Sequence, residues 1–146
     1  MKLEEIEKLW MVDANIDDSD LGREALNIPQ LHAKWYAMLM EEKRIMYAFS
    51  IKKDELELIL EGYYGKTLTM SELKELGLPD YPDKKILRPD IPKHIQTNPE
   101  MVKLNLKIAM QSDKIDFIKD ILKQIHGRSF IIKDAIQWVI FQAGGR

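Results

Sequence analysis

Hydrophobic side chains recur at helical spacing along most of the chain. The longest such pattern begins at Ile28 and reaches about Tyr64. Alternate steps of three and four residues along this segment land on an apolar or aromatic residue at nine of eleven positions, with Glu42 and Lys52 as the exceptions. The nine are Ile28, Leu31, Trp35, Met38, Ile45, Phe49, Leu56, Ile59 and Tyr63. A heptad pattern of this length predicts one long helix with a continuous apolar stripe.

The length of this helix raises the question of what covers its stripe. A straight helix from residue 28 to residue 64 measures about 55 Å, whereas a compact domain of this size is about 40 Å across. We therefore expect cover from other helices of the chain, from further copies of the chain, or from both. The alternative to an assembly is an elongated monomeric bundle with a kink at Pro29. Proline also fits the first turn of a helix, because it has no N–H to donate.

Shorter helices are predicted around this central one. Residues 2–11 have an apolar side typical of an amphipathic helix. An acidic turn follows, in which Asp18 or Ser19 is expected to cap the next helix. Residues 69–76 predict a two-turn helix with Gly77 as its C-cap.

The second half of the chain begins with a proline-rich stretch. Five of the six prolines lie between residues 78 and 99, which predicts an extended connector. Thr97 and Glu100 then have the spacing of a capping box at a helix start. Gly127 predicts the end of that helix, and Ser129 predicts the cap of a final helix near the C-terminus.

No segment shows the apolar–polar alternation of a strand, so the predicted fold class is all-α. The length of 146 residues is that of one domain. Within it we expect N-terminal helices over residues 1–66, a Pro-rich connector with a short helix over residues 67–98, and C-terminal helices over residues 99–146.

Composition and charge exclude several classes of protein. Cysteine is absent, which excludes a disulfide scaffold and a thiol nucleophile. No run of apolar residues approaches membrane-spanning length, so we expect no transmembrane helix. The first seven residues include three acids where a signal peptide needs a basic start and an apolar core, so we expect a cytoplasmic protein. The net charge of −2 is unevenly distributed between the two halves of the chain. Residues 1–83 hold 10 Lys/Arg against 18 Asp/Glu, a net −8, and residues 84–146 hold 12 against 6, a net +6.

The residues offer no recognisable catalytic or metal-binding pattern. His32, His94 and His126 are scattered, without the spacing to a carboxylate that a zinc helix requires. Acid pairs are adjacent in sequence and therefore point about 100° apart on a helix, so they do not form a facing acid–base pair. We expect no catalysis, no cofactor and no metal.

Binding of single-stranded nucleic acid is a possible function, because basic side chains occur beside aromatic ones. Cations contact phosphates and rings stack on bases in such sites. The basic candidates are Lys43, Arg44, Lys52 and Lys53 in the long helix and Lys84, Lys85 and Arg88 in the connector. The candidate stacking rings are Tyr47, Tyr63 and Tyr64. Basic residues of this kind also serve simply to solvate a helix face or a connector, and the pattern leaves both readings open.

Three groups of residues resemble the UvsY family, the recombination mediators of T4-like phages. The matching positions are Ile16, Asp17, Leu21, Glu24, Ala25, Asn27, Leu31, Lys34 and Trp35; then Lys52, Lys53, Leu56, Leu60, Glu61, Tyr63 and Gly65; and finally Arg128, Phe130, Ile132, Lys133, Phe141, Ala143 and Gly144. They occur in the family's order and at its total length. The connector around residues 70–97 is not covered.

The resemblance implies a non-enzymatic helical protein and a specific function. Such proteins assemble into ring-like homo-oligomers, hexamers or heptamers, and bind single-stranded DNA. They help a RecA-like phage recombinase to replace the phage single-strand-binding protein. The resemblance also places oligomerisation in the C-terminal helix, here at Ile132, Ile136, Val139 and Ile140.

The chain departs from the family pattern at two positions. Basic residues that follow the Lys-Lys pair in the family fall on Glu57 and Ile59 here, and neither side chain can pair with a phosphate. We therefore expect Lys52 and Lys53 to be supplemented by Lys43, Arg44 and the basic connector. The alternative function is a coiled-coil scaffold that binds proteins and no nucleic acid.

Overall fold

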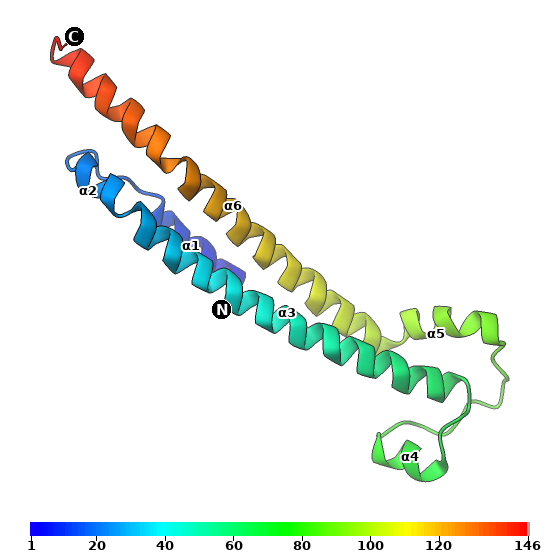
Figure 1. Ribbon diagram of the computed structural model, residues 1–146. Helices are drawn as coiled ribbons and strands as arrows, with labels where there is room; N and C mark the ends of the chain where they lie inside the picture. Colours follow the sequence, from blue (N-terminus) through cyan, green and yellow to red (C-terminus); the bar gives the residue numbers. More distant parts are fainter. Residues whose placement is uncertain (146) are drawn as a thin grey trace. The chain divides into compact units, whose positions relative to one another are not determined.

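The computed structural model of the protein describes residues 1–145, which contain helices and no β-strand (Figure 1). In chain order the elements are α1 (Leu3–Asp13), α2 (Leu21–Leu26), α3 (Ile28–Tyr64), α4 (Met70–Glu75), the short 3-10 helix η1 (Arg88–Asp90), α5 (Ile91–Thr97) and α6 (Pro99–Gln142). The predicted all-α class is confirmed.

The chain forms two compact units that do not follow its linear order. The first unit combines Met1–Arg44 with the chain from Ser112 onward, and the second is Ile45–Gln111. Both α3 and α6 contribute one segment to each unit. These units are defined by how the residues pack, whereas the predicted divisions at residues 66 and 98 follow the order of the chain.

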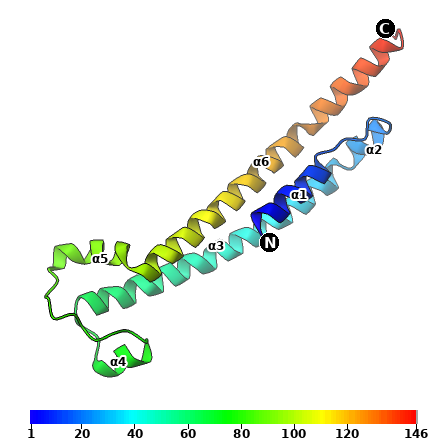
Figure 2. The ribbon, with the colours of Figure 1, turned by 180° about the vertical axis from the view of Figure 1, so that it is seen from behind.

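The first unit covers its part of the apolar stripe with helices of the same chain. Trp35 of α3 is completely buried, and its ring meets Trp10 of α1 edge-on at 5.6 Å. The indole Nε1 of Trp35 donates a hydrogen bond of 3.0 Å to the Asp13 carboxylate. Figure 2 shows α1 alongside the first half of α3. No second copy is needed to bury the stripe at this point.

A buried arginine also holds the first unit together. The guanidinium of Arg128 in α6 donates to the backbone oxygens of Asp13 and Asn15, at 2.9 Å each, and to the Glu24 carboxylate at 3.1 Å. The side chain of Arg128 is 7% exposed and that of Glu24 is 21% exposed. This contact fixes the loop after α1 and the start of α2 on α6.

The start of α3 decides between the two expectations for Pro29. Asn27 ends α2, α3 begins at Ile28, and Pro29 occupies the first turn. A backbone N–H at this position would have no helical partner, so the proline does not destabilise the helix. The helix continues to Tyr64, where the heptad pattern predicted its end.

Two predicted helix caps are wrong by one residue or two. The cap of α2 is Asp20, whose Oδ1 accepts from the Arg23 N–H, rather than Asp18 or Ser19. The cap of α6 is Asn98, whose Oδ1 accepts from the Glu100 and Met101 N–H groups at 2.9 and 3.3 Å. Thr97 is the last residue of α5 instead. Its hydroxyl donates to the Lys93 carbonyl within that helix, at 3.0 Å.

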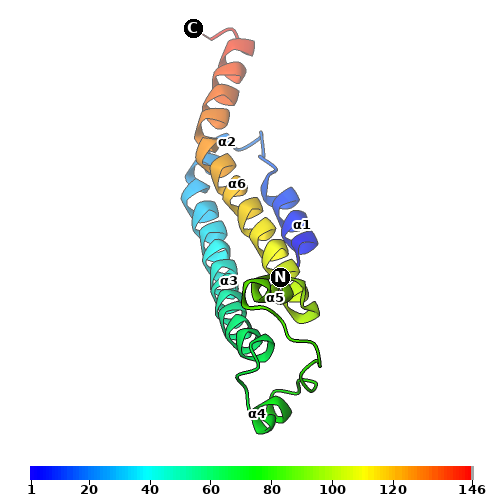
Figure 3. The same cartoon turned by 90° about the vertical axis from the view of Figure 1, so that its right-hand side faces the viewer.

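The connector is more ordered than its prolines suggest. Residues 88–97 form η1 and α5, with Pro89 and Pro92 in the first turns. Ile95 packs in a small core with Leu60 and Met101. Figure 3 shows α5 leading directly into the start of α6. The expectation of an extended segment is therefore wrong for these ten residues, because a proline in a first turn does not prevent a helix.

The predicted break at Gly127 is absent. α6 runs without interruption through Gly127 and Ser129 to Gln142, and a left-handed Gly144 (φ 75°) follows it. Ile125, Arg128 and Ile132 are all buried and share one face of this helix. Their burial keeps the backbone helical across the glycine.

We expect the Gly127→Ala substitution to raise the free energy of unfolding by about 0.5–1 kcal/mol, because alanine restricts the unfolded chain and fits a helix interior. An added Cβ at residue 127 meets no atom within 4 Å. Urea denaturation followed by circular dichroism measures the change. A destabilised variant would indicate a left-handed residue at position 127 and contradict the continuous helix.

Among the described residues, no helix is both long and apolar enough to cross a lipid bilayer.

Candidate nucleic-acid interface

Aromatic side chains gather at the end of α3, in the second unit. The Tyr63 ring lies 5.2 Å from that of Tyr64 and 5.6 Å from that of Tyr81, and the Tyr64 ring lies 5.5 Å from that of His94. The Tyr81 hydroxyl donates to the Leu68 carbonyl at 2.5 Å. These contacts tie the segment between α4 and η1 to the end of α3.

Tyr63 is the buried member of this cluster. Its side chain is 8% exposed and its hydroxyl donates to the Asp80 carbonyl at 3.3 Å. Burial raises the pKa of the Tyr63 phenol above its ordinary value of 10.0, and the nearby Tyr64, Asp80 and Tyr81 add to the rise. The phenol therefore stays protonated at neutral pH and remains a hydrogen-bond donor.

The turn after α3 contains a backbone conformation that is unusual for its residue. Lys66 is left-handed (φ 56°), although Gly65 stands beside it. Hydrogen bonds from the Lys66 N–H to Tyr63 and from the Thr67 N–H to Gly62 close the helix end around it. A left-handed lysine costs about 1 kcal/mol relative to glycine. Strain of this kind is concentrated at functional sites, and it marks this turn as a candidate.

A cavity of about 740 Å³ opens beside this turn. Its lining combines the Tyr64 ring with apolar groups from Ile86, Ile91 and Pro92. Asn98 holds Tyr64 in place, because its amide donates to the Tyr64 hydroxyl at 3.1 Å. A volume of this size with apolar lining residues is typical of sites for small ligands or for single groups of a larger ligand.

Cations surround this cavity. Lys66, Lys85 and Arg88 contribute to its lining, against one carboxylate from Glu61. An adjoining hollow of about 520 Å³ shares Tyr64 and Lys85 and adds further polar groups. These further groups are Lys84, His94 and Asp90. Positive charge around a fixed, partly exposed ring is the arrangement that holds a phosphate and a stacked base.

The structure brings together only part of the predicted set. Lys85, Arg88 and Tyr64 meet around this cavity and Lys84 lines the adjoining hollow, whereas the buried ring of Tyr63 is not presented to a base. Lys66 joins the site although the sequence analysis missed it. The only signal was its place directly after Gly65, at the end of the long helix.

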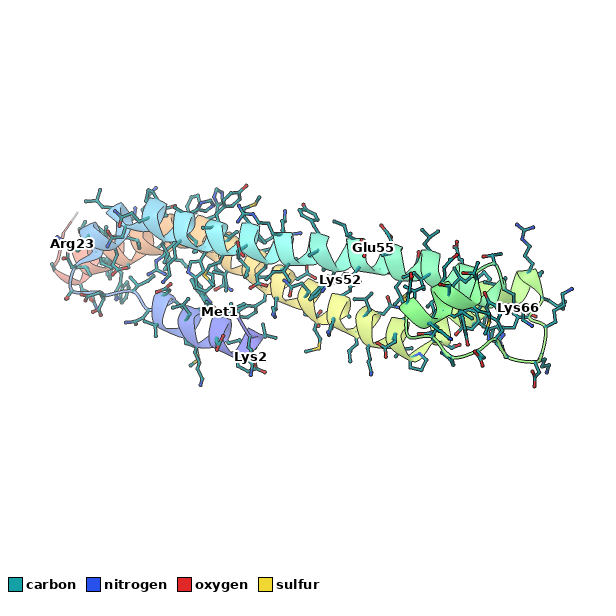
Figure 4. The ribbon with its side chains drawn as sticks, turned by 90° about the horizontal axis from the view of Figure 1, so that it is seen from below. Met1, Lys2, Arg23, Lys52, Glu55 and Lys66 are labelled. Atoms are coloured by element: carbon teal, nitrogen blue, oxygen red, sulfur yellow. The ribbon has the colours of Figure 1, made fainter. Side chains whose placement is uncertain are left out.

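The remaining candidates on α3 lie outside the cavity. Lys52 is exposed and Lys53 is half-buried, about 18 Å along the helix from Tyr64. Figure 4 shows Lys52 on α3 and Lys66 in the turn that follows the helix. Tyr47 is exposed on the same helix. Lys52 therefore marks a position where the apolar stripe faces solvent.

The basic pair at residues 43 and 44 belongs to the first unit. Lys43 is half-buried, and the exposed Arg44 pairs with Glu41 at 2.9 Å, one turn away. An exposed pair of this kind contributes less than about 1 kcal/mol and breaks easily, so Arg44 remains accessible to an anion.

The residues expected to mediate oligomerisation divide into two groups. Ile132 is buried within the single chain, whereas Ile136, Val139 and Ile140 are exposed. Trp138 and Phe141 are exposed beside them, with their rings stacked at 5.6 Å. The end of α6 therefore presents a continuous set of large apolar side chains.

Comparison with protein families decides the relationship of the chain. Residues 9–145 match the family model described as "Recombination, repair and ssDNA binding protein UvsY". The chain belongs to the UvsY family. UvsY proteins are non-catalytic recombination mediators, so the protein is not an enzyme. The family implies a role in phage recombination and repair that involves single-stranded DNA. No curated protein sequence matches the chain.

Solved UvsY structures have the same fold. The chain is similar to the bacteriophage T4 recombination mediator protein UvsY in crystal lattice type II, with a TM-score of 0.81 and 20% identity over 98% of each chain. The type IV lattice of that protein gives a TM-score of 0.81 with 21% identity, over 97% of this chain and 99% of the other. Among the described residues, no cluster of His, Asp and Glu side chains could hold a metal ion.

Proposed function

We propose that this UvsY protein binds single-stranded DNA at the cavity beside α3 and acts as a recombination mediator in the cytoplasm of the infected host cell. The observation that carries the proposal is the set of cations, Lys66, Lys85 and Arg88, around the fixed ring of Tyr64. Lys84 extends the positive surface, and Lys52 and Lys53 supply contacts further along α3.

Assembly through the end of α6 would strengthen these contacts. Ile136, Val139 and Ile140 are exposed and apolar, as a contact between copies requires. Once one subunit holds a strand, the next subunit meets it at high effective concentration. The resemblance to the family implies a ring-like homo-oligomer. Such an oligomer would bind a strand tightly through many individually weak phosphate contacts. It would load a RecA-like recombinase onto strands covered by the phage single-strand-binding protein.

The test is the fluorescence anisotropy of labelled oligo-dT with the full-length protein over a range of salt concentrations. A duplex of equal length is the comparison. We expect preferential binding to the single strand that weakens with salt, because phosphate contacts release counterions. Replacing Lys85 and Arg88 by Gln should lower the steepness of the log–log salt plot by about 1.4, since each contact to a single strand contributes about 0.7.

The control removes two exposed lysines elsewhere, Lys8→Gln with Lys74→Gln, which matches the change in charge. This control should bind like the wild-type protein. If the Lys85→Gln/Arg88→Gln variant binds with the affinity and salt dependence of the wild-type protein, the strand does not bind at the cavity. Failure of the wild-type protein to bind any strand, with self-assembly intact, would favour the second candidate, a protein scaffold. Glu57 and Ile59 at positions that are basic in the family favour that candidate.

A further inference from the structure

Four basic side chains and one aromatic side chain form a row on the part of α6 that belongs to the first unit. Lys119, Lys123, His126, Phe130 and Lys133 follow one another at steps of four, three, four and three residues. Such steps place all five on one face of the helix. All five are exposed. We call these five residues the α6 stripe.

A groove of about 520 Å³ runs along part of this stripe. Lys119, Leu122, Lys123 and His126 line it from α6, and His32 lines it from α3. No carboxylate is among these lining residues. The His32 ring stacks on the half-exposed ring of Tyr36, with centroids 6.0 Å apart and planes 12° apart. The groove thus has two lysines on its α6 wall and the ring of His32, stacked on Tyr36, on its α3 wall.

The lysines of the α6 stripe are free to bind an anion. The ion pairs of residues 1–145 include none of Lys119, Lys123 and Lys133. Asp116 and Asp120 each precede a stripe lysine by three residues, yet neither pairs with it. A charge that is not neutralised by its own chain keeps its full attraction for a ligand.

We propose that the α6 stripe is a second contact for the backbone of single-stranded nucleic acid, separate from the cavity in the other unit. Lys119 and Lys123 are about 6 Å apart along the helix axis, and their flexible side chains can reach neighbouring phosphates of one strand. Phe130, 68% exposed, and Tyr36, 50% exposed, offer faces on which bases can stack. The proposal rests on the proposed function, because the ligand is the same strand.

The test compares Lys119→Gln/Lys123→Gln with the Lys8→Gln/Lys74→Gln control in the oligo-dT titration, using the full-length protein. We expect the stripe variant to bind several-fold more weakly and to lower the steepness of the log–log salt plot by about 1.4. Phe130→Ala should weaken binding without changing this steepness, because a stacking ring releases no counterions. Sedimentation velocity of each variant reports whether self-assembly is unchanged.

The outcomes distinguish a failure of this proposal from a failure of the proposed function. If the stripe variant binds as the wild type does, while Lys85→Gln/Arg88→Gln binds more weakly, the α6 stripe is not a strand contact and the proposed function stands. If the stripe variant changes the assembly and not the affinity per subunit, the stripe meets an acidic surface of another copy and the proposal is overturned. If the wild-type protein binds no strand, both proposals fail.

Discussion

The Arg128→Ala variant is expected to unfold with a free energy about 3–5 kcal/mol lower than that of the wild-type protein. The guanidinium supplies hydrogen bonds to Asp13, Asn15 and Glu24. Its removal leaves a largely buried carboxylate and two backbone oxygens without their donor, and breaking a buried pair from one side has a cost of this size. Urea denaturation followed by circular dichroism measures the loss.

Arg44→Ala is the matched control, because Arg44 is also ion-paired but 73% exposed. We expect it to change the unfolding free energy by less than about 1 kcal/mol. A second variant, Glu24→Gln, keeps an acceptor for the guanidinium and should cost less than Arg128→Ala. Equal stability of Arg128→Ala and the wild type would show that the loop after α1 is not anchored on α6.

If copies of the chain associate through the end of α6, as proposed, charges placed there are expected to dissociate them. Val139 and Ile140 are 53% and 48% exposed in the single chain. If they are covered by another copy, replacing both with Asp removes about 3 kcal/mol of apolar burial and adds two charges that must lose water. The first term alone weakens self-association about a hundredfold. Sedimentation velocity of the purified protein measures the change in mass.

The control for this variant introduces the same charges at another exposed apolar pair. Met11 and Val12, at the end of α1, are 75% and 72% exposed. We expect Met11→Asp/Val12→Asp to assemble as the wild-type protein does. An unchanged mass for Val139→Asp/Ile140→Asp would place the contact between copies elsewhere. Far-ultraviolet circular dichroism checks that both variants keep their helices.

The sequence predicted the types of residue that form the candidate site but not which of them lie together. Basic residues at 84, 85 and 88 and the ring at 64 are visible in the sequence, and the structure places them around the cavity and its adjoining hollow. The heptad pattern placed Tyr63, and not Tyr64, on the apolar stripe of α3, so the sequence indicated its burial although Tyr63 was counted as a stacking ring. Adjacent helical residues point about 100° apart, and which one faces the core depends on what packs against α3. Lys66 was missed because a left-handed lysine is rare.

The sequence by itself determined the all-α class, the C-terminal end of α3 and the resemblance to UvsY. These depend on periodicity over many residues, where many small preferences add up. The tertiary structure decided the rest. Gly127 looked like a helix end because glycine disfavours a helix by about 1 kcal/mol. The burial of Ile125 and Ile132 on either side and the hydrogen bonds of the buried Arg128 outweigh that preference. Packing overrides a signal from a single residue, because burying one side chain changes the free energy of folding by more than the helix propensity of one residue does.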